Sequence, residues 1–113
     1  MISDQERQQR IQDFEEAINM TPHQLENWLQ TEESQSVGQQ RSGEDEAIGH
    51  QSGRRIANIL RKHKADYTQD DLDHMQRVVS YVHRHTAQRP SGDIKDSRWR
   101  YSLMNWGHDP TKD

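Results

Sequence analysis

Residues 97–110 read SRWRYSLMNWGHDP and decide how this chain can fold, because they hold three of its seven aromatic side chains, Trp99, Tyr101 and Trp106. Large aromatic side chains bury about 150 to 250 Å² each. Only 28% of the 113 residues are hydrophobic and 30% are charged, so the chain has material for a thin core only. The three rings must therefore either form much of that core or be offered to a partner.

This segment is predicted to be a helix that turns its tryptophans inward. Trp99, Leu103 and Trp106 are spaced i, i+4 and i+7, which is the period of one helix face, and this spacing favours core packing over an exposed stacking platform. The residues predicted to cap the helix are Asp96 or Ser97 at its start and Gly107 at its end. The opposite side of the helix carries the side chains best placed for outside contacts: Arg98, Tyr101 and Asn105.

The preceding helix is predicted to begin after Thr68, which has the position of an N-cap, and to stop at the turn RPSGD of residues 89–93. Three carboxylates occupy its first turns, where the positive end of the helix dipole favours them: Asp70, Asp71 and Asp73. Its apolar arc consists of Leu72, Met75, Val78, Val79 and Val82. The side chains predicted to lie outward are Arg77, Tyr81, Arg84 and His85.

A third helix is predicted over residues 44–63, although Gly49 and Gly53 weaken its first half and could limit it to Ser52 onward. Its second half is amphipathic at 100° per residue. One face, predicted to pack, carries Ile56, Ile59, Leu60 and His63. The opposite, basic face carries Arg54, Arg55, Asn58, Arg61 and Lys62.

Two further helices are predicted near the N-terminus. The first, over residues 4–19, has a narrow apolar stripe of Ile11, Phe14 and Ile18. The second opens at Thr21-Pro22, where Gln24 completes a capping-box pattern. It presents one apolar face, made of Leu25, Trp28 and Leu29. Residues 31–45 lack periodicity and are predicted to be a loop.

These patterns predict an all-α fold, a compact bundle of about five helices with a long polar loop and an extended N-terminal helix. No apolar run approaches the roughly 20 residues that span a bilayer. The start, MISDQERQQR, lacks the apolar region of a signal peptide, and cysteine is absent. We therefore expect a cytoplasmic protein without membrane contact.

The sequence does not suggest an enzyme, a bound metal or a cofactor. It has no cysteine nucleophile, no serine on a strand–turn elbow and no glycine-rich phosphate loop. His83 and His85 are two residues apart and so point to different sides of a helix. A site assembled in space from His50, His83 and His108 stays open as an alternative. The aspartates after Thr68 need no role as acid/base residues or metal ligands, because carboxylates are favoured at the start of a helix.

The charge is distributed unevenly along the chain. Through His50 there are three basic residues against eleven acidic ones, whereas from Gln51 onward there are twelve against eight. The basic half suggests a surface that binds a polyanion. Alternatively, the basic and acidic halves could form two surfaces that attract each other. The residues predicted to contact nucleic acid are Arg54, Arg55, Arg61, Lys62, Lys64, Arg77, Arg84, His85, Arg89, Arg98 and Arg100. The same residues could equally form a solvated face or a protein contact.

Four blocks of sequence carry a family resemblance: MTPHQLENWLQTEESQSVG, GHQSGRRIANILRK, YVHRHTAQRPSGD and SRWRYSLMNWGHDP. Together they resemble a small uncharacterised microbial family of unknown function whose members are often labelled DNA-binding proteins. The resemblance runs from about Phe14 to Lys112. It implies a single domain over residues 14–112, preceded by an N-terminal extension of residues 1–13, and it favours a nucleic-acid partner.

The first hypothesis is a non-enzymatic protein of the nucleoid that binds double-stranded DNA, mainly through phosphate contacts from a continuous basic strip. The alternative is a protein-interaction module or homo-oligomer that joins acidic and basic surfaces. A third hypothesis is a ligand or metal site built from His50, His83, Arg100, Asn105 and His108.

Overall fold

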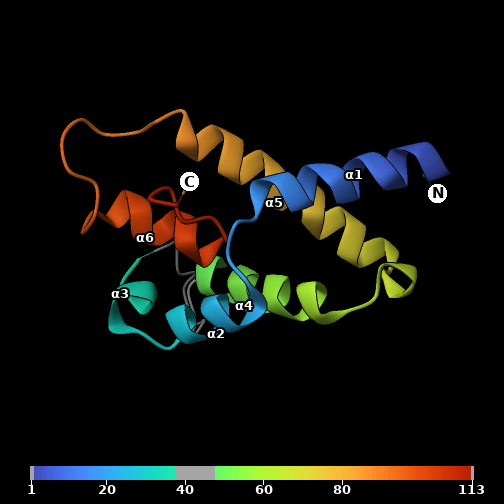
Figure 1. Cartoon of the computed structure of the whole chain (residues 1–113), viewed down its shortest axis with the longest axis horizontal. Coiled ribbons are helices and arrows are strands. Elements are labelled where there is room, and N and C mark those ends of the chain that lie inside the picture. The colour runs from blue at the N-terminus through green and yellow to red at the C-terminus, as the bar shows by residue number, and fades with distance from the viewer. Residues whose placement is uncertain (1, 38–47, 113) are drawn as a thin grey trace.

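Every element in the described part of the computed structural model is helical (Figure 1). The structure describes residues 2–37 and 48–112. In chain order the elements are α1 (Asp4–Ala17), α2 (Pro22–Leu29), α3 (Glu32–Gln35), α4 (Ile48–Arg61), the 3-10 turn η1 (Lys64–Asp66), α5 (Gln69–Thr86) and α6 (Arg98–Asn105). The predicted all-α fold is confirmed.

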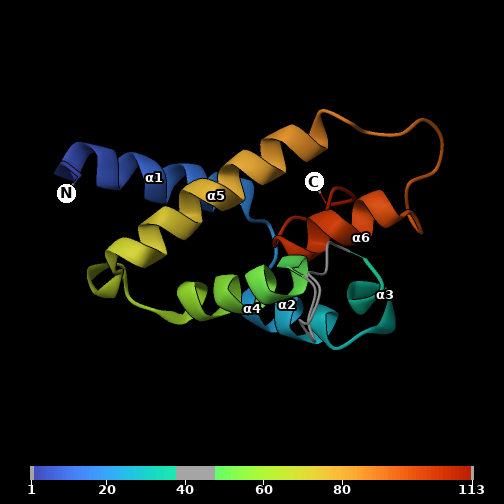
Figure 2. The ribbon, with the colours of Figure 1, turned by 180° about the vertical axis from the view of Figure 1, so that it is seen from behind.

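The helices form two pairs with α6 between them. α1 runs along α5, and α2 packs on α4. α4 and α5 diverge from the corner at η1, and α6 lies towards the open end of this V, as both views show (Figures 1 and 2). From there α6 contacts α2, α3, α4 and α5. The helix that carries the tryptophan segment therefore ties the two pairs together.

The hydrophobic core takes at least one almost fully buried side chain from each long helix and from each of the short helices α2 and α6. Phe14, Leu25, Ile56, Met75 and Leu103 are each at most 1% exposed and belong to one cluster. Burial of such a side chain contributes about 1.5 to 3 kcal/mol. Because the cluster draws on α1, α2, α4, α5 and α6, no helix pair has a complete core by itself.

The predicted helix starts are confirmed in their details. Thr21 and Gln24 exchange side chain–backbone hydrogen bonds in a capping box, and Thr68 and Asp71 form another. Ser97, not its neighbour, caps α6. Caps of this kind are local, because a polar side chain satisfies a backbone N–H two or three residues ahead. They are therefore readable from sequence.

One prediction about the middle of the chain is wrong, and one alternative is settled. Residues 32–35 form α3, with Thr31 as N-cap, where a loop was predicted; most of the remaining loop lies outside the described residues. The helix predicted over residues 44–63 is present as α4, which includes the turn before Ser52 and so does not begin there. Gly53 has a tertiary role, since a Cβ on it would lie 2.5 Å from the backbone oxygen of Asn105 and 2.7 Å from Leu29.

The outer face predicted for α6 is wrong for Tyr101 and Asn105, which are covered, whereas Arg98 is exposed. Asn105 is fully buried, where its Oδ1 accepts hydrogen bonds from Trp28 Nε1 and Ser34 Oγ. Its Nδ2 donates to the carbonyl oxygen of Ser34 at 3.0 Å. Tyr101 is half-buried with its ring 5.4 Å from that of Trp28. These two side chains hold α6 to α2 and α3.

The tryptophans of α6 turn inward, as predicted, and stack with rings of α5. Trp106 is buried and lies 4.2 Å from the Tyr81 ring; Tyr81 stacks on His85, and His85 on Trp99. The prediction that Tyr81 and His85 lie outward is therefore wrong. α5 packs against two helices, α1 and α6. Its buried face is therefore wider than the arc of its aliphatic residues.

Candidate nucleic-acid interface

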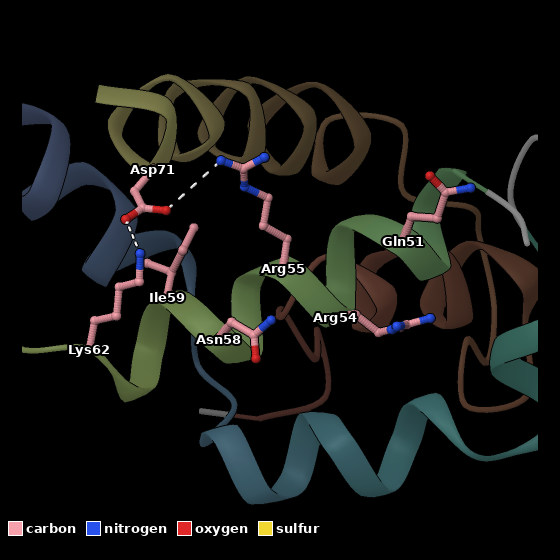
Figure 3. Close-up of a pocket in the computed structure, with 7 residues that line it drawn as sticks. All are labelled: Gln51, Arg54, Arg55, Asn58, Ile59, Lys62 and Asp71. Carbon is pink, nitrogen blue, oxygen red and sulfur yellow. Dashed lines mark hydrogen bonds and ion pairs between the residues drawn. The ribbon is translucent and has the colours of Figure 1, made fainter. Parts of the chain in front are cut away.

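Three of the predicted cations line one hollow of about 680 Å³ between α4 and α5, which we call the α4–α5 hollow (Figure 3). Arg54 and Arg55 reach it from the middle of α4, and Lys62 reaches it from the position directly after the helix. The other residues that line it are Gln51, Asn58, Ile59 and Asp71. With three cations and one carboxylate, its walls carry an excess of positive charge.

Asp71 organises the cations of this hollow from the first turn of α5. It is buried, and its carboxylate lies 2.7 Å from Lys62 Nζ and 3.9 Å from Arg55 Nη2. Burial acts to raise the pKa of this carboxyl, but hydrogen bonds from Lys62 and Thr68 outweigh it and leave the pKa below its ordinary value. The carboxylate stays ionised and holds both cations at the mouth of the hollow.

The buried His74 on α5 is influenced by basic residues of both α4 and α5. The buried Nε2 of His74 and the Oγ of Ser52 share a hydrogen bond at 3.0 Å, which links the two helices. Burial, followed by the positive charges of Arg55 and Arg77, lowers its pKa to about 4. Arg55 on α4 and Arg77 on α5 therefore flank the same neutral imidazole.

Arg84 is a further cation on α5. It follows Arg77 by seven residues, which places both side chains on the same side of the helix. Both are exposed, and neither forms an ion pair with any residue in the described part of the chain. The acidic neighbour Asp73 pairs instead with Arg10 at 3.1 Å.

Three other predicted cations lie elsewhere and are each paired with an acid. Arg61 donates hydrogen bonds from two guanidinium nitrogens to the carboxylate of Glu26 on α2. Lys64 lies 2.9 Å from Glu15 of α1. Arg100 makes a bidentate pair with Asp109 and also donates to the carbonyl oxygen of Lys95. The structure does not bring these three into the surface between α4 and α5.

The remaining predicted residues lie around the start of α6. Arg89 sits over the ring of Trp99 at 5.5 Å, and Arg98 donates to the backbone oxygen of Ser36 at 3.1 Å. His85 is half-buried between Tyr81 and Trp99, and burial lowers the pKa of its imidazole. Its neutral ring is part of the aromatic packing and adds no cation to the surface.

Sequence reasoning missed Gln51 and Asp71 as parts of the hollow and gave Asn58 no role of its own. Gln51 could have been found by its spacing, since it precedes Arg54 by one helix turn. No pattern in the sequence pointed to Asp71 as part of the hollow, because an aspartate in the first turn of a helix is already favoured by the helix dipole. Its contact with Lys62 depends on how α4 and α5 meet.

Four of the five residues of the third hypothesis are committed to other contacts, and the fifth, His83, is exposed on α5. His50 Nε2 contacts the carbonyl oxygen of Leu29, and His108 Nδ1 that of Ala17. Asn105 and Arg100 hold the partners described above. Among the described residues, no group of three His, Asp or Glu side chains could hold a metal ion. No helix in that part of the chain is long and apolar enough to cross a membrane.

Comparisons with known proteins gave one result. A family model described as a protein of unknown function matches residues 13–104, which is most of the chain. No curated protein and no solved structure matches the chain. The function must therefore be argued from the geometry of this molecule.

Proposed function

Since the chain belongs to the DUF3140 family of proteins of unknown function, we propose its function from its own surface: it binds double-stranded DNA, mainly through the phosphate backbone. The observation that carries this proposal is the α4–α5 hollow, where three cations face one carboxylate. The binding surface consists of this hollow and the exposed flank of α5. The protein acts in this proposal as a non-enzymatic binder in the cytoplasm.

Phosphate binding is favoured by the kind of cation on this surface. Guanidinium groups present several N–H donors in a planar fork that matches two phosphate oxygens. Arg54 and Arg55 lie at the hollow, and Arg77 and Arg84 continue from it along α5. A duplex carries a phosphate charge about every 1.7 Å of its axis, so a line of arginines can neutralise several at once.

Not all of the basic residues belong to this surface. Arg61, Lys64 and Arg100 are paired with Glu26, Glu15 and Asp109, and they lie towards other helices. They therefore lie outside the proposed binding surface. The proposed contacts come from the residues at the hollow and along α5: Arg54, Arg55, Lys62, Arg77 and Arg84.

A salt titration of the affinity for a duplex tests the proposal. With about five phosphate contacts, the affinity is expected to fall about 500-fold between 50 and 200 mM salt. The double variant Arg77→Ala/Arg84→Ala is expected to bind more weakly to every duplex and to reduce the slope of log affinity against log salt by about 2. Fluorescence anisotropy with a labelled duplex measures both.

The matched control for that variant is Lys95→Ala/Lys112→Ala, which removes the same charge from exposed positions outside this surface, one between α5 and α6 and one after α6. It is expected to leave the slope within experimental error of the original protein. An affinity that does not change with salt, or an equal loss in both double variants, would contradict the proposal. A protein that self-associates in light scattering and leaves DNA unbound would favour the interaction module instead.

A further inference from the structure

Four exposed polar side chains form a stripe along α4, which we call the α4 stripe: Gln51, Arg54, Arg55 and Asn58. Their spacing of i, i+3, i+4 and i+7 places them within about 100° of each other around the helix. Figure 3 shows them projecting from consecutive turns of α4. α4 contains no acidic residue, so nothing on the helix itself repels a polyanion.

The α4 stripe stands between two depressions. The α4–α5 hollow lies on one side, and a second hollow of about 400 Å³ between α4 and α2 lies on the other. Arg54 and Asn58 line both hollows. These two residues therefore occupy a ridge, which is the shape a helix needs if it is to enter the groove of a duplex.

The reverse face of α4 fixes the helix firmly in the fold. Ile56 and Ile59 are at most 1% exposed, and Gly53 lets the backbone approach α2 and α6 closely. The buried link from Ser52 to His74 holds α4 to α5. Side chains that read a partner work best on such a rigid element, because their positions are set before binding.

The side chains of the α4 stripe are the types that read base edges. Asn and Gln form bidentate hydrogen bonds with N6 and N7 of adenine, and Arg does so with O6 and N7 of guanine. A solvated helix face is usually covered with Lys and Glu, yet none of these four positions carries either residue. The composition of the stripe therefore points to recognition rather than to solubility alone.

We propose that α4 enters the major groove of double-stranded DNA, where the α4 stripe reads base edges. This inference rests on the DNA-binding function proposed above and adds sequence specificity to it. The major groove is about 12 Å wide and admits one α-helix. In this arrangement Lys62 and the α5 arginines Arg77 and Arg84 contact the phosphates at the edge of the groove, and Asp71 steadies Arg55.

Selection of bound duplexes from a random pool tests the inference. The protein is expected to enrich a short motif, and Asn58→Ala is expected to lose the preference at one base pair of it. The affinity of this variant for the selected duplex should fall about 10- to 100-fold, because one bidentate base contact is lost. Its affinity for an unrelated duplex should fall much less than its affinity for the selected one, and its salt slope should stay the same because no phosphate contact is removed.

The matched control is Asn27→Ala, which removes another exposed asparagine from the neighbouring helix α2. It is expected to keep both the motif and the affinity. Thermal unfolding of both variants checks that each is folded, and Gln51→Ala provides a second test at the other end of the α4 stripe.

The outcomes separate this inference from the function on which it rests. If Arg77→Ala/Arg84→Ala weakens binding but the pool yields no motif, α4 does not read bases, and the phosphate-binding function stands. If a motif is enriched and both Asn58→Ala and Gln51→Ala keep it, the reading element is not α4. If no duplex is bound at low salt, both proposals are wrong.

Discussion

At the scale of single residues, the most constrained polar side chain is Asn105. It is fully buried, and it satisfies the indole N–H of Trp28 and both the hydroxyl and the carbonyl oxygen of Ser34. A buried polar group that loses its partner costs about 1 to 3 kcal/mol. One amide therefore keeps α2, α3 and α6 in register.

Asn105→Ala is expected to lower the free energy of unfolding by about 3 kcal/mol, because it leaves the buried groups of Trp28 and Ser34 without partners. Urea denaturation followed by circular dichroism measures the change. Asn58→Ala serves as the control, since Asn58 is exposed and its loss should change the free energy by less than about 0.5 kcal/mol. Equal effects of the two substitutions would show that Asn105 does not hold the helices together.

At the scale of elements, α4 shows how packing overrides helix propensity. Two glycines in one helix disfavour it by about 1 kcal/mol each relative to alanine. Yet Gly53 lies where a Cβ would meet the backbone of α6 and the side chain of Leu29. The helix pays this local cost because α2, α4 and α6 can then approach each other.

Gly53→Ala is expected to destabilise the protein by about 1 to 3 kcal/mol, despite the better helix propensity of alanine. The added Cβ would lie 2.5 Å from a backbone oxygen, which cannot move without shifting α6. Gly49→Ala is the matched control within α4. Its Cβ would be 3.4 Å from the nearest atom, so this substitution should be neutral or stabilising by up to about 1 kcal/mol. Thermal unfolding of both variants compares them directly, and a stabilised Gly53→Ala would refute the close approach.

At the scale of the whole molecule, the contact between the two helix pairs depends on a neutral histidine. His74 hydrogen-bonds to Ser52 of α4, and its ring stacks on Trp106 of α6 at 6.3 Å. Arg55 and Arg77 lie close enough to oppose a positive charge there, while Asp71 favours one. Burial dominates, so the folded protein keeps this ring unprotonated until its pKa of about 4.

The stability is therefore expected to decrease as the pH falls from about 6.5 to about 4. In this window the unfolded chain binds a proton at His74 and the folded chain does not, so unfolding takes up a proton. Above the pKa of His74 in the unfolded state, the neutral ring contributes its full share to the free energy of unfolding, which is about 3 kcal/mol at most. Burial also lowers the pKa of His85, so this residue adds to the loss of stability at low pH.

Urea denaturation at several pH values measures this loss, and His74→Gln is expected to flatten the slope between pH 6.5 and 4. His83→Gln, at an exposed position of the same helix, should keep the slope of the original protein. A slope that survives His74→Gln unchanged would place the responsible proton elsewhere.

The five longer helices and most of their caps were determined by the sequence alone. Capping boxes at Thr21 and Thr68, the glycine after α6 and the inward tryptophans are all patterns within a few residues of each other. Hydrogen bonds at helix ends and the spacing of apolar side chains act over one or two turns, so the local sequence is sufficient to predict them.

Only the tertiary structure decided which cations belong to the candidate interface. Arg61 meets Glu26, Lys64 meets Glu15, and the other cations paired with acids likewise find them by the way the helices pack. α3 and the burial of Asn105 escaped prediction for the same reason. An ion pair or a buried amide joins residues far apart in the chain, and the free energy of that contact exists only once the helices have come together.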